Sequence, residues 1–555
     1  MTPRIATALG LALAAALCAA LYVPFLSNPR VFDDFVFYSG QRFSEYAMSP
    51  FGAGVRFPAY FTLAWVETVF GRMEAHRIAG LLLHLSCGGV LYLLLRELRI
   101  SRLVSVGGAA AFLVHPVAVY GAAYLMQRTI VMATLFAVIS VVLFLRGLRE
   151  RRLAVAVPAA MAYAMAVLSK EHALLLPAVA FAALPLIGAP RAFTLRYAGL
   201  YAALCAPAAV AVVLFAKSLI GAPYEWQFQS VTAEVAASRG TPGVELPWIG
   251  SAVAQAVLFF RYAAAWLFPI TSHMAIDIKI DFAALWQPWV AGPALAAYAA
   301  WGALAAWLLL RRPALAVAGF GLAWVWLLFA AEFAVMRYQE PFVLYRSYLW
   351  APGFLVPAAA MLERVPRRAL APLLVSVALF LALQARDRLE TFSSSLALWE
   401  DAAAKLPQHA IPGGWRTYYM LGREYLYAER PQRAVQVVER CMALYPESSD
   451  CRFARAAIHM QAEQYEAALP HLARAIELSP KSGAVRHHLG WALENLGCIE
   501  EAKAQYRVSS KLGYVGGRYR LMRLDKPGSG LLPPRRDGAP RECSEAIRSA
   551  VLPPG

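Results

Sequence analysis

The stretch IATALGLALAAALCAALYVPFL, residues 5–26, decides the class of fold. About 20 apolar residues in a row form a helix long enough to cross a bilayer. The rest of the chain is similar in character, since 60% of its 555 residues are hydrophobic and only 16% are charged. The mean hydropathy of +0.50 exceeds that of an ordinary soluble protein, so the sequence predicts an integral membrane protein. A cleaved signal peptide is the alternative for residues 5–26.

Ten further apolar runs predict an all-α domain in residues 1–390 with about 11 to 13 membrane spans. The runs are residues 78–95, 104–122, 129–145, 153–168, 173–188, 197–217, 291–310, 314–335, 348–362 and 369–384.

Arginines gather in the loops between these runs: Arg96, Arg99 and Arg102; Arg146, Arg149, Arg151 and Arg152; Arg191 and Arg196; Arg311 and Arg312; Arg364, Arg367 and Arg368. With Arg4 inside, the first three groups fall on every second loop, as the positive-inside rule requires. The net charge of +17 is therefore a signal of topology. No basic patch with interleaved aromatic residues predicts a nucleic-acid partner.

Two outer segments complete this topology. Residues 27–77 form an outer loop, in which the short apolar patch at 60–70 carries Glu67 and is expected to be an interfacial helix. Residues 218–290 begin and end outside, so the apolar run at 252–270 is expected to lie on the membrane or dip into it. If that run spans instead, a second crossing nearby must restore the alternation.

Nearly all polar groups suited to chemistry fall on the outer side of this topology: Asp33, Asp34, His115, Gln127, Arg128, Lys170, Glu171, His172, Asp277, Tyr345 and Arg346. Ionisable residues at membrane level are costly and mark a substrate path. The sequence therefore predicts one functional site on the outer face.

The second domain, residues 407–515, has a period of 34 residues. Pro446 and Pro480 are 34 apart, as are Ala434, Ala468 and Ala502, and as are Gly422, Ala456 and Gly490. Small residues at fixed offsets let paired helices approach closely, so the pattern predicts three tetratricopeptide repeats. Such arrays bind peptides or proteins in a groove, and the alternative role is a rigid cap or dimerisation element. Residues 524–555 are rich in Pro, Gly and Arg, which is typical of a disordered tail or one draped over the array.

Four of the seven cysteines, Cys441, Cys451, Cys498 and Cys543, lie in this polar C-terminal part. They permit two disulfides if that part faces an oxidising compartment, and four reduced thiols otherwise.

Several motifs in a fixed order resemble the transmembrane and tetratricopeptide-repeat O-mannosyltransferases and their bacterial relatives, which belong to the GT-C superfamily of polyprenyl-phosphate-dependent glycosyltransferases. The motifs are Phe32-Asp33-Asp34, Arg56-Phe57-Pro58, Leu81-Leu82-Leu83-His84-Leu85, His115-Pro116-Val117, Gln127-Arg128, Leu168-Ser169-Lys170-Glu171-His172 and Tyr345-Arg346-Ser347-Tyr348-Leu349. The resemblance covers roughly residues 20–384 and the repeats. The family usually reads Arg-Pro without the inserted Phe57, and more often Gly-Arg at Gln127-Arg128.

The resemblance implies that Asp33 or Asp34 is the catalytic base and that the sugar arrives on a polyprenyl carrier. The leaving phosphate needs fixed positive charge, for which guanidinium groups are suited, so Arg128 and Arg346 are the first candidates and Lys170 the third. Further site candidates are Arg56, His115, Gln127, Glu171, His172 and Tyr345.

Plainer roles remain open for several of these residues. The two aspartates can cap a helix, His115-Pro116 can form a turn, and Arg128 and Arg346 can anchor lipid headgroups. Paired carboxylates with histidine can hold a divalent cation, but lipid monophosphate donors in the superfamily do not require one, and we expect no metal and no other cofactor.

The leading hypothesis is an inverting glycosyltransferase that acts on an exported protein held by the repeats. Alternatives are transfer to a lipid or envelope glycan, and a non-catalytic assembly factor for pilus or polysaccharide export. The high Ala, Arg and Leu content is typical of a GC-rich bacterial genome, which predicts the inner membrane, with the site and the repeats on the periplasmic side.

Overall fold

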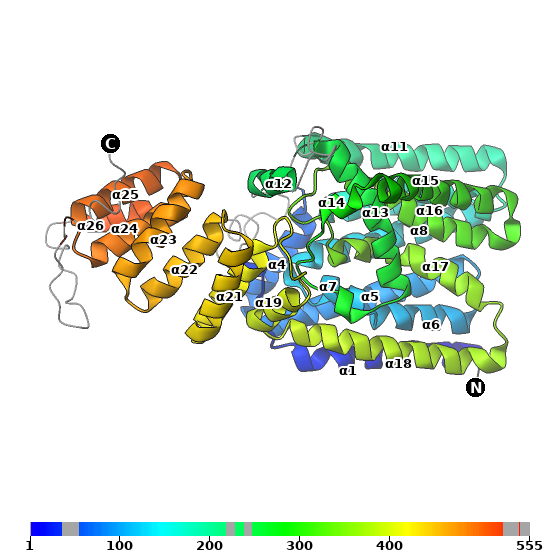
Figure 1. Ribbon diagram of the computed structural model, residues 1–555. Helices are drawn as coiled ribbons and strands as arrows, with labels where there is room; N and C mark the ends of the chain where they lie inside the picture. The colour runs from blue at the N-terminus through cyan, green and yellow to red at the C-terminus, as the bar shows by residue number, and fades with distance from the viewer. Residues whose placement is uncertain are drawn as a thin grey trace. The chain divides into compact units, whose positions relative to one another are not determined.

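The computed structural model describes residues 2–35, 55–217, 222, 228–237, 247–525, 543 and 545. The chain divides into two compact units, Met1–Lys405 and Leu406–Gly555, which we call the membrane unit and the repeat unit (Figure 1). Regular structure in the described residues is helical, apart from an isolated bridge between Ile278 and Phe342. This confirms the all-α prediction.

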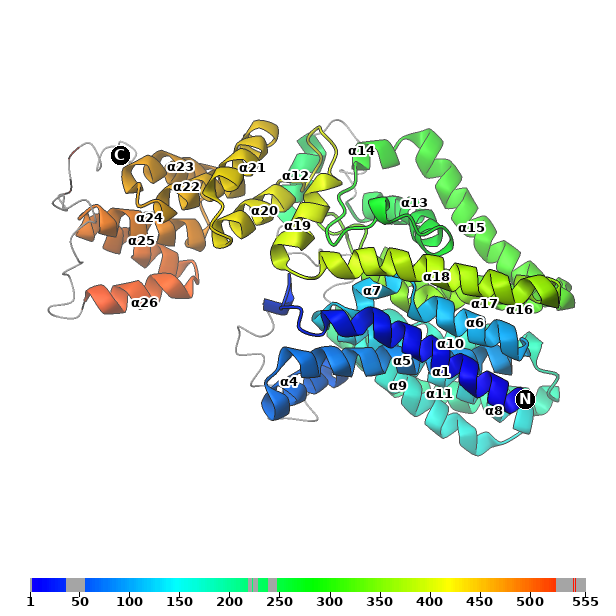
Figure 2. The same cartoon turned by 90° about the horizontal axis from the view of Figure 1, so that it is seen from below.

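The long helices of the membrane unit follow the predicted apolar runs. They are α1 (Pro3–Tyr22), α5 (Met73–Glu97), α8 (Arg128–Glu150), α9 (Ala156–Ser169), α11 (Arg191–Ala216), α15 (Pro288–Arg311), α16 (Ala316–Phe329), α17 (Ala351–Leu362) and α18 (Arg367–Thr391). Figure 2 shows α1 and α18 side by side along one face of the bundle, and the two helices are in contact.

Eight helices of the described part are long and apolar enough to cross a membrane, or nine if a bent pair forms one span. The predicted count of about 11 also included 153–168 and 173–188, which form shorter apolar helical segments, and 348–362, where α17 has 12 residues.

The predicted span at 104–122 is a bent pair of helices. Helix α6 (Arg102–Leu113) and helix α7 (Pro116–Ala122) are bent by 61° at their junction. Proline lacks the backbone N–H that continues a helix and disfavours helical geometry in the residue before it. Accordingly His115 is extended, and its side chain accepts a hydrogen bond from Val117 N as the cap of α7.

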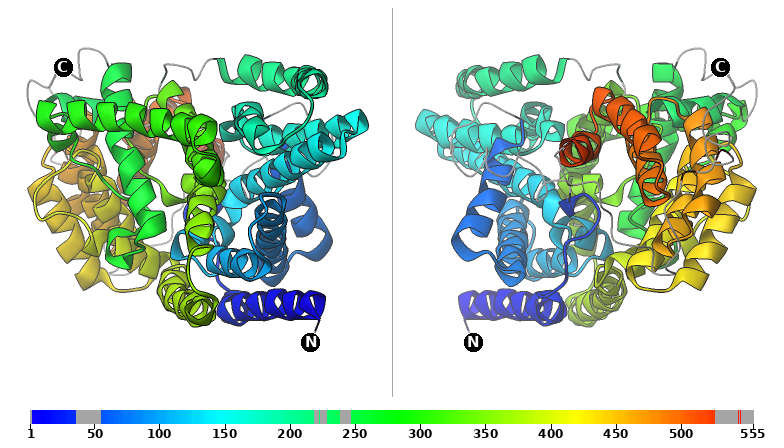
Figure 3. Two further views of the ribbon diagram at one scale, coloured as in Figure 1. Left: turned by 90° about the vertical axis from the view of Figure 1, so that its right-hand side faces the viewer. Right: turned by 90° about the vertical axis from the view of Figure 1, so that its left-hand side faces the viewer.

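The predicted outer segments contain two helices of interest. Helix α4 (Phe57–Phe70) corresponds to the expected interfacial helix, and its Glu67 lies 2.7 Å from both Arg30 Nη2 and His76 Nε2. Helix α13 (Pro247–Leu267) is long enough to span, yet Figures 1 and 3 show it running across the direction of α1 and α18. Whether this helix spans the membrane or lies on it stays a prediction.

The remaining short helices of the membrane unit are α10 (Leu176–Ala182), α12 (Phe228–Ala237), α14 (Phe282–Leu285) and α19 (Ser395–Ala404). Helix α19 extends this unit beyond the expected boundary at residue 390, because Asp401 pairs with Arg388 of α18 at 3.1 Å.

The repeat unit consists of three antiparallel helix pairs and one further helix. The pairs are α20 (Trp415–Tyr427) with α21 (Pro431–Leu444), α22 (Ser449–Gln461) with α23 (Tyr465–Leu478), and α24 (Gly483–Asn495) with α25 (Ile499–Lys511), followed by α26 (Val515–Leu524). These are the three predicted repeats.

Close packing within each pair explains the small residues of the period. A Cβ atom at Gly422 would lie 2.7 Å from Val438 Cγ2, and one at Gly490 would lie 2.7 Å from the Tyr506 ring. Ala434, which recurs at the equivalent positions of the other repeats, is fully buried. Larger side chains there would separate the helices.

Both permitted disulfides form in the structure, between Cys441 and Cys451 and between Cys498 and Cys543. The second joins the last repeat to the tail, most of which lies outside the described residues. Stable disulfides are typical of an oxidising compartment.

Candidate functional site

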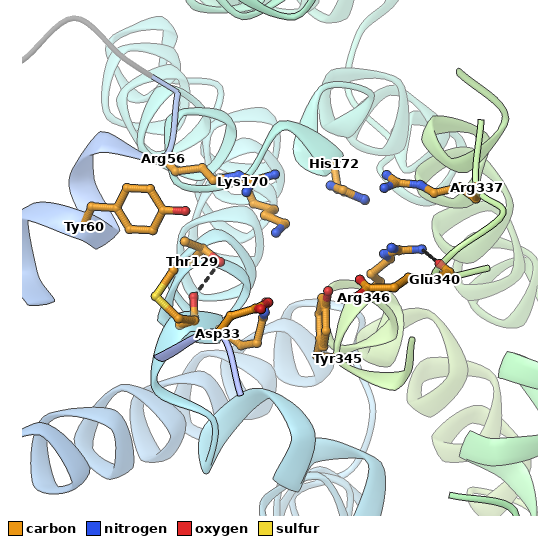
Figure 4. A pocket seen from close by; sticks show the side chains of 12 residues that line it. Asp33, Arg56, Tyr60, Thr129, Lys170, His172, Arg337, Glu340, Tyr345 and Arg346 are labelled. Carbon is orange, nitrogen blue, oxygen red and sulfur yellow. Dashed lines mark hydrogen bonds between the residues drawn. The ribbon is translucent and has the colours of Figure 1, made fainter. Parts of the chain in front are cut away.

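A cavity of about 210 Å³ opens at the predicted outer end of the membrane unit. Polar and charged side chains dominate its walls (Figure 4). The lining residues are Asp33, Arg56, Tyr60, Met126, Gln127, Thr129, Lys170, His172, Arg337, Glu340, Tyr345 and Arg346. The structure thus brings together residues from segments that are up to about 310 positions apart in the sequence, as the one-sided topology predicts.

The two adjacent aspartates have different surroundings. Asp34 is fully buried, and its carboxylate accepts hydrogen bonds from Val31 N at 3.1 Å and Met126 N at 3.0 Å. Burial raises the pKa of Asp34 to about 6, although the nearby Arg77 charge lowers it. Asp33 lines the cavity, so it is the member of the pair that can reach a ligand there.

The local backbone explains this division. Phe32 has a φ of 51°, a left-handed conformation that is uncommon for a bulky residue. Its ring packs against Trp399 with a centroid distance of 5.5 Å and against Tyr124 at 6.1 Å. Asp33 N donates a hydrogen bond to Tyr124 Oη at 3.0 Å. These contacts fix the turn that places Asp33 at the cavity.

Three cationic side chains lie across the cavity from Asp33, as Figure 4 shows for Lys170, Arg337 and Arg346. Lys170 follows the end of α9, and its Nζ lies 5.9 Å from the centroid of the Tyr345 ring. Burial, together with the nearby charges of Arg56 and Arg346, lowers the pKa of Lys170 to about 7.

A buried carboxylate holds two of these cations. Glu332 has no exposed surface, and its Oε2 lies 3.4 Å from Arg346 Nη1 and 3.5 Å from Arg337 Nε. Its Oε1 lies 2.9 Å from His172 Nε2. Arg346 also donates to the Glu340 carbonyl at 3.1 Å. Because an unpaired charge would be costly at this depth, Glu332 keeps the guanidinium groups in place at the cavity wall.

Arg56 connects the outer loop to the segment after α9. Its Nη2 and Nε lie 2.5 Å and 3.1 Å from the Glu171 carboxylate in a two-pronged ion pair. Its own backbone is left-handed, with a φ of 70°, and its N–H donates to Leu168 O at 2.7 Å. Burial alone would raise the pKa of Glu171, but the Arg56 charge outweighs it and holds this pKa well below its usual range.

Other residues singled out in the sequence lie elsewhere. Arg128 Nη2 donates to His76 O at 3.0 Å and does not line the cavity. His115 stacks on Trp266 at a centroid distance of 4.3 Å, in addition to capping α7. Asp277 forms a buried ion pair with Lys279 at 2.7 Å. His115 thus has the plainer turn role, whereas Arg346, Lys170, Arg56, Gln127, His172 and Tyr345 line the cavity.

Sequence reasoning missed Glu332, Arg337 and Glu340, as well as Tyr60 and Thr129. A signal for Glu332 existed, because an ionisable residue within a predicted span, here 314–335, indicates a functional site. Nothing local in the sequence distinguishes Tyr60 and Thr129 from ordinary helix residues.

Each carboxylate oxygen of Asp34 accepts one backbone hydrogen bond. Among the described residues, one group of potential ligands lies close together, namely Cys498, Glu501 and Cys543. Its two cysteines are joined in a disulfide.

Comparison with known proteins identifies the repeats directly. Tetratricopeptide-repeat family models match residues 416–448 and 459–510. No curated protein sequence matches the chain.

Among solved structures, the chain is similar to an oligosaccharyltransferase from Archaeoglobus fulgidus tethered to an acceptor peptide, at 16% identity and a TM-score of 0.39, over 76% of this chain and 59% of that one. It is also similar to the same organism's oligosaccharyltransferase AglB with an inhibitory peptide and a dolichol-phosphate, at 16% identity and a TM-score of 0.37, over 75% and 60%. The APC/C Cut9–Hcn1 hetero-tetramer matches at 13% identity and a TM-score of 0.24, over 89% and 93%. The chain spans about three fifths of the length of the oligosaccharyltransferases.

Proposed function

We propose that this protein is a membrane glycosyltransferase of the GT-C superfamily that moves a sugar from a polyprenyl-phosphate carrier to a hydroxyl group of an exported protein. One observation carries the proposal: Asp33 faces Lys170, Arg337 and Arg346 across a single cavity at the predicted outer end of the helical bundle. A carboxylate opposite a group of cations is the arrangement that transfer from a phosphate leaving group requires. The order of motifs resembling the O-mannosyltransferases supports the same assignment.

In the proposed reaction, Asp33 accepts the proton of the acceptor hydroxyl while that oxygen attacks the anomeric carbon. The bond between this carbon and the phosphate oxygen breaks, and its electron pair leaves with the lipid phosphate. Attack opposite the leaving group inverts the configuration. Lys170 and Arg346 stabilise the negative charge that develops on the phosphate, since guanidinium and ammonium groups bind phosphate well.

Supporting residues keep this arrangement in place. Glu332 holds Arg346 and Arg337, and Glu171 holds Arg56. Asp34 fixes the loop through the amides of Val31 and Met126, so we assign it a positioning role. Four cationic side chains at the cavity supply the charge that a divalent metal would otherwise provide, and we propose a metal-independent reaction.

The repeats are proposed to hold the acceptor protein. A row of rings crosses three helices of the repeat unit: Tyr419 and Phe453 have centroids 6.5 Å apart, Phe453 and His488 4.8 Å, and His488 and Trp491 6.2 Å. Aromatic side chains supply large contact areas for a bound chain at low cost in conformational entropy. The two disulfides are consistent with the proposed periplasmic location.

Mass spectrometry of exported proteins and glycolipids, from cells with and without the gene, tests the proposal. We expect a hexose or pentose to disappear from at least one exported protein and to return with the wild-type gene but not with Asp33→Asn. Removal of residues 407–555 should abolish protein modification. If protein modification persists in that truncated form, the repeats do not hold the acceptor. If neither the protein pool nor the glycolipid pool changes, the protein is better explained as an assembly factor.

A further inference from the structure

A second cavity, of about 400 Å³, opens at the end of the membrane unit opposite to the site. It lies where the C-terminal ends of α5, α8 and α15 meet the start of α16 and the turn at Leu184–Leu186. The arginine clusters of the predicted topology place this end at the cytoplasmic side. The cavity therefore belongs to a different leaflet from the proposed donor site.

The rim of this cavity is basic. Arg99 and Arg149 line it together with one carboxylate, Glu97. The Glu97 carboxylate accepts a hydrogen bond from Arg146 Nε at 2.6 Å and also pairs with Arg149. Glu97, Arg146 and Arg149 together therefore carry one net positive charge. Arg99 adds a second one: it is exposed, and no carboxylate of the described residues lies within ion-pair distance of its guanidinium.

The inner wall is apolar. Pro185, Leu186 and Ile187 line it, as do Leu309 and Leu310 of α15. Leu310 is 68% exposed, so this apolar wall extends to the surface of the membrane unit. Just after Leu310 in the sequence, the Arg312 guanidinium lies 4.8 Å from the centroid of the Trp307 ring. Tryptophan and arginine are the residues that mark the level of the headgroups.

We propose that this cavity binds one anionic phospholipid of the cytoplasmic leaflet, with its phosphate between Arg99 and Arg149 and one acyl chain along the apolar wall. A basic pocket between transmembrane helices on the cytoplasmic side has the chemistry that anionic headgroups recognise. The apolar wall distinguishes a lipid from a free phosphate compound, because glycerol phosphate has no acyl chain to lie along it. The bound lipid bridges α5, α8 and the α15–α16 hairpin.

Native mass spectrometry of the full-length protein in detergent tests this proposal. The probes are dioleoylphosphatidylglycerol, dioleoylphosphatidylcholine and free glycerol 3-phosphate. We expect wild-type protein to retain one phosphatidylglycerol at least about tenfold more strongly than phosphatidylcholine, and glycerol 3-phosphate not to compete. Arg99→Gln combined with Arg149→Gln should remove the preference.

Two further variants make the result specific. Arg367→Gln combined with Arg368→Gln removes two charges from the same predicted face without touching the cavity, and it should leave the preference unchanged. Ile187→Trp fills the cavity from its apolar side with no change in charge, and it should weaken lipid retention. Thermal unfolding of each variant verifies that it is folded.

Three outcomes would overturn the proposal: equal retention of the two lipids by wild-type protein, an equal loss of preference in the Arg367/Arg368 variant, or full competition by glycerol 3-phosphate. None of them bears on the glycosyltransferase proposal, which rests on the opposite end of the bundle.

Discussion

The two aspartates at positions 33 and 34 provide the most direct test of the site, because the structure predicts opposite consequences for the same substitution at neighbouring positions. Asp33→Asn removes the proposed base and leaves the shape of the cavity almost unchanged. A positioned base contributes roughly 10²–10⁴-fold, which corresponds to about 3 to 5 kcal/mol of activation free energy. We therefore expect kcat to fall by that factor, with little change in thermal stability.

Asp34→Asn is expected to lower the stability of the folded protein. One side-chain oxygen is replaced by an amide N–H₂ group, which cannot accept a hydrogen bond, so either Val31 N or Met126 N loses its partner. Leaving a buried donor unsatisfied costs about 1 to 3 kcal/mol. We expect a lower unfolding temperature and a kcat that falls less than in the Asp33 variant.

The assay is transfer from a radiolabelled polyprenyl-phosphate sugar by purified full-length enzyme, combined with thermal unfolding followed by tryptophan fluorescence. Asp33→Glu is the matched control that retains a carboxylate, and it should keep more activity than Asp33→Asn. If Asp34→Asn abolishes turnover at unchanged stability while Asp33→Asn is fully active, the assignment of the two residues is reversed.

Three further predictions follow from the same site and from the repeat unit. Burial and the neighbouring arginines lower the pKa of Lys170 to about 7, so its charge is present below pH 7 and is lost above it, and KM for the lipid donor should rise as the pH increases from 6 to 8.5. Lys170→Arg should flatten this rise, and an unchanged slope in that variant would exclude Lys170 as its cause. In the unfolded chain Lys170 has its ordinary pKa of about 10.4, so between pH 7 and 10 the unfolded state binds more protons at this group than the folded state. The contribution of Lys170 to the free energy of unfolding therefore increases as the pH rises through that range. Transfer should withstand dialysis against EDTA, measured as the initial rate, and loss of activity that Mg²⁺ or Mn²⁺ restores would refute the metal-independent reaction. Cys498→Ser combined with Cys543→Ser should destabilise the repeat unit by about 4 kcal/mol, against about 3 kcal/mol for Cys441→Ser combined with Cys451→Ser, because the longer loop loses more entropy on closure. Chemical denaturation of each variant measures the difference, and an equal or reversed order would contradict the loop-entropy explanation.

Hydropathy alone predicted most of the helical framework, because burial in a membrane requires long apolar runs and leaves few other solutions. At 104–122 the window average includes His115-Pro116 without registering the break that proline imposes, which divides this segment into α6 and α7. It also predicted a span at 173–188, where the chain forms the short helix α10 and a 3₁₀ turn. The 34-residue period was sufficient for the repeats, because their packing depends on small residues at a few positions.

The site was only partly predictable. The alternation of loops determines which end of the bundle a residue occupies, and that argument brought Asp33, Lys170 and Arg346 to one face. It cannot determine the direction of a side chain. Arg128 stands at the same level but turns toward the His76 carbonyl, and Asp34 turns into the protein because Phe32 adopts a left-handed conformation. These choices depend on contacts between segments that are distant in the sequence.

The buried carboxylate of Glu332 has a consequence for the end of the catalytic cycle. Under the proposed reaction, the carrier leaves with one more negative charge than it brought, so the same cations that favour bond breaking hold the spent carrier more tightly than the fresh donor. Glu332 offsets part of that attraction from behind Arg337 and Arg346. Under the proposed reaction, the Glu332 charge thus speeds release of the spent carrier. The turnover rate then depends both on stabilising the departing phosphate and on releasing it.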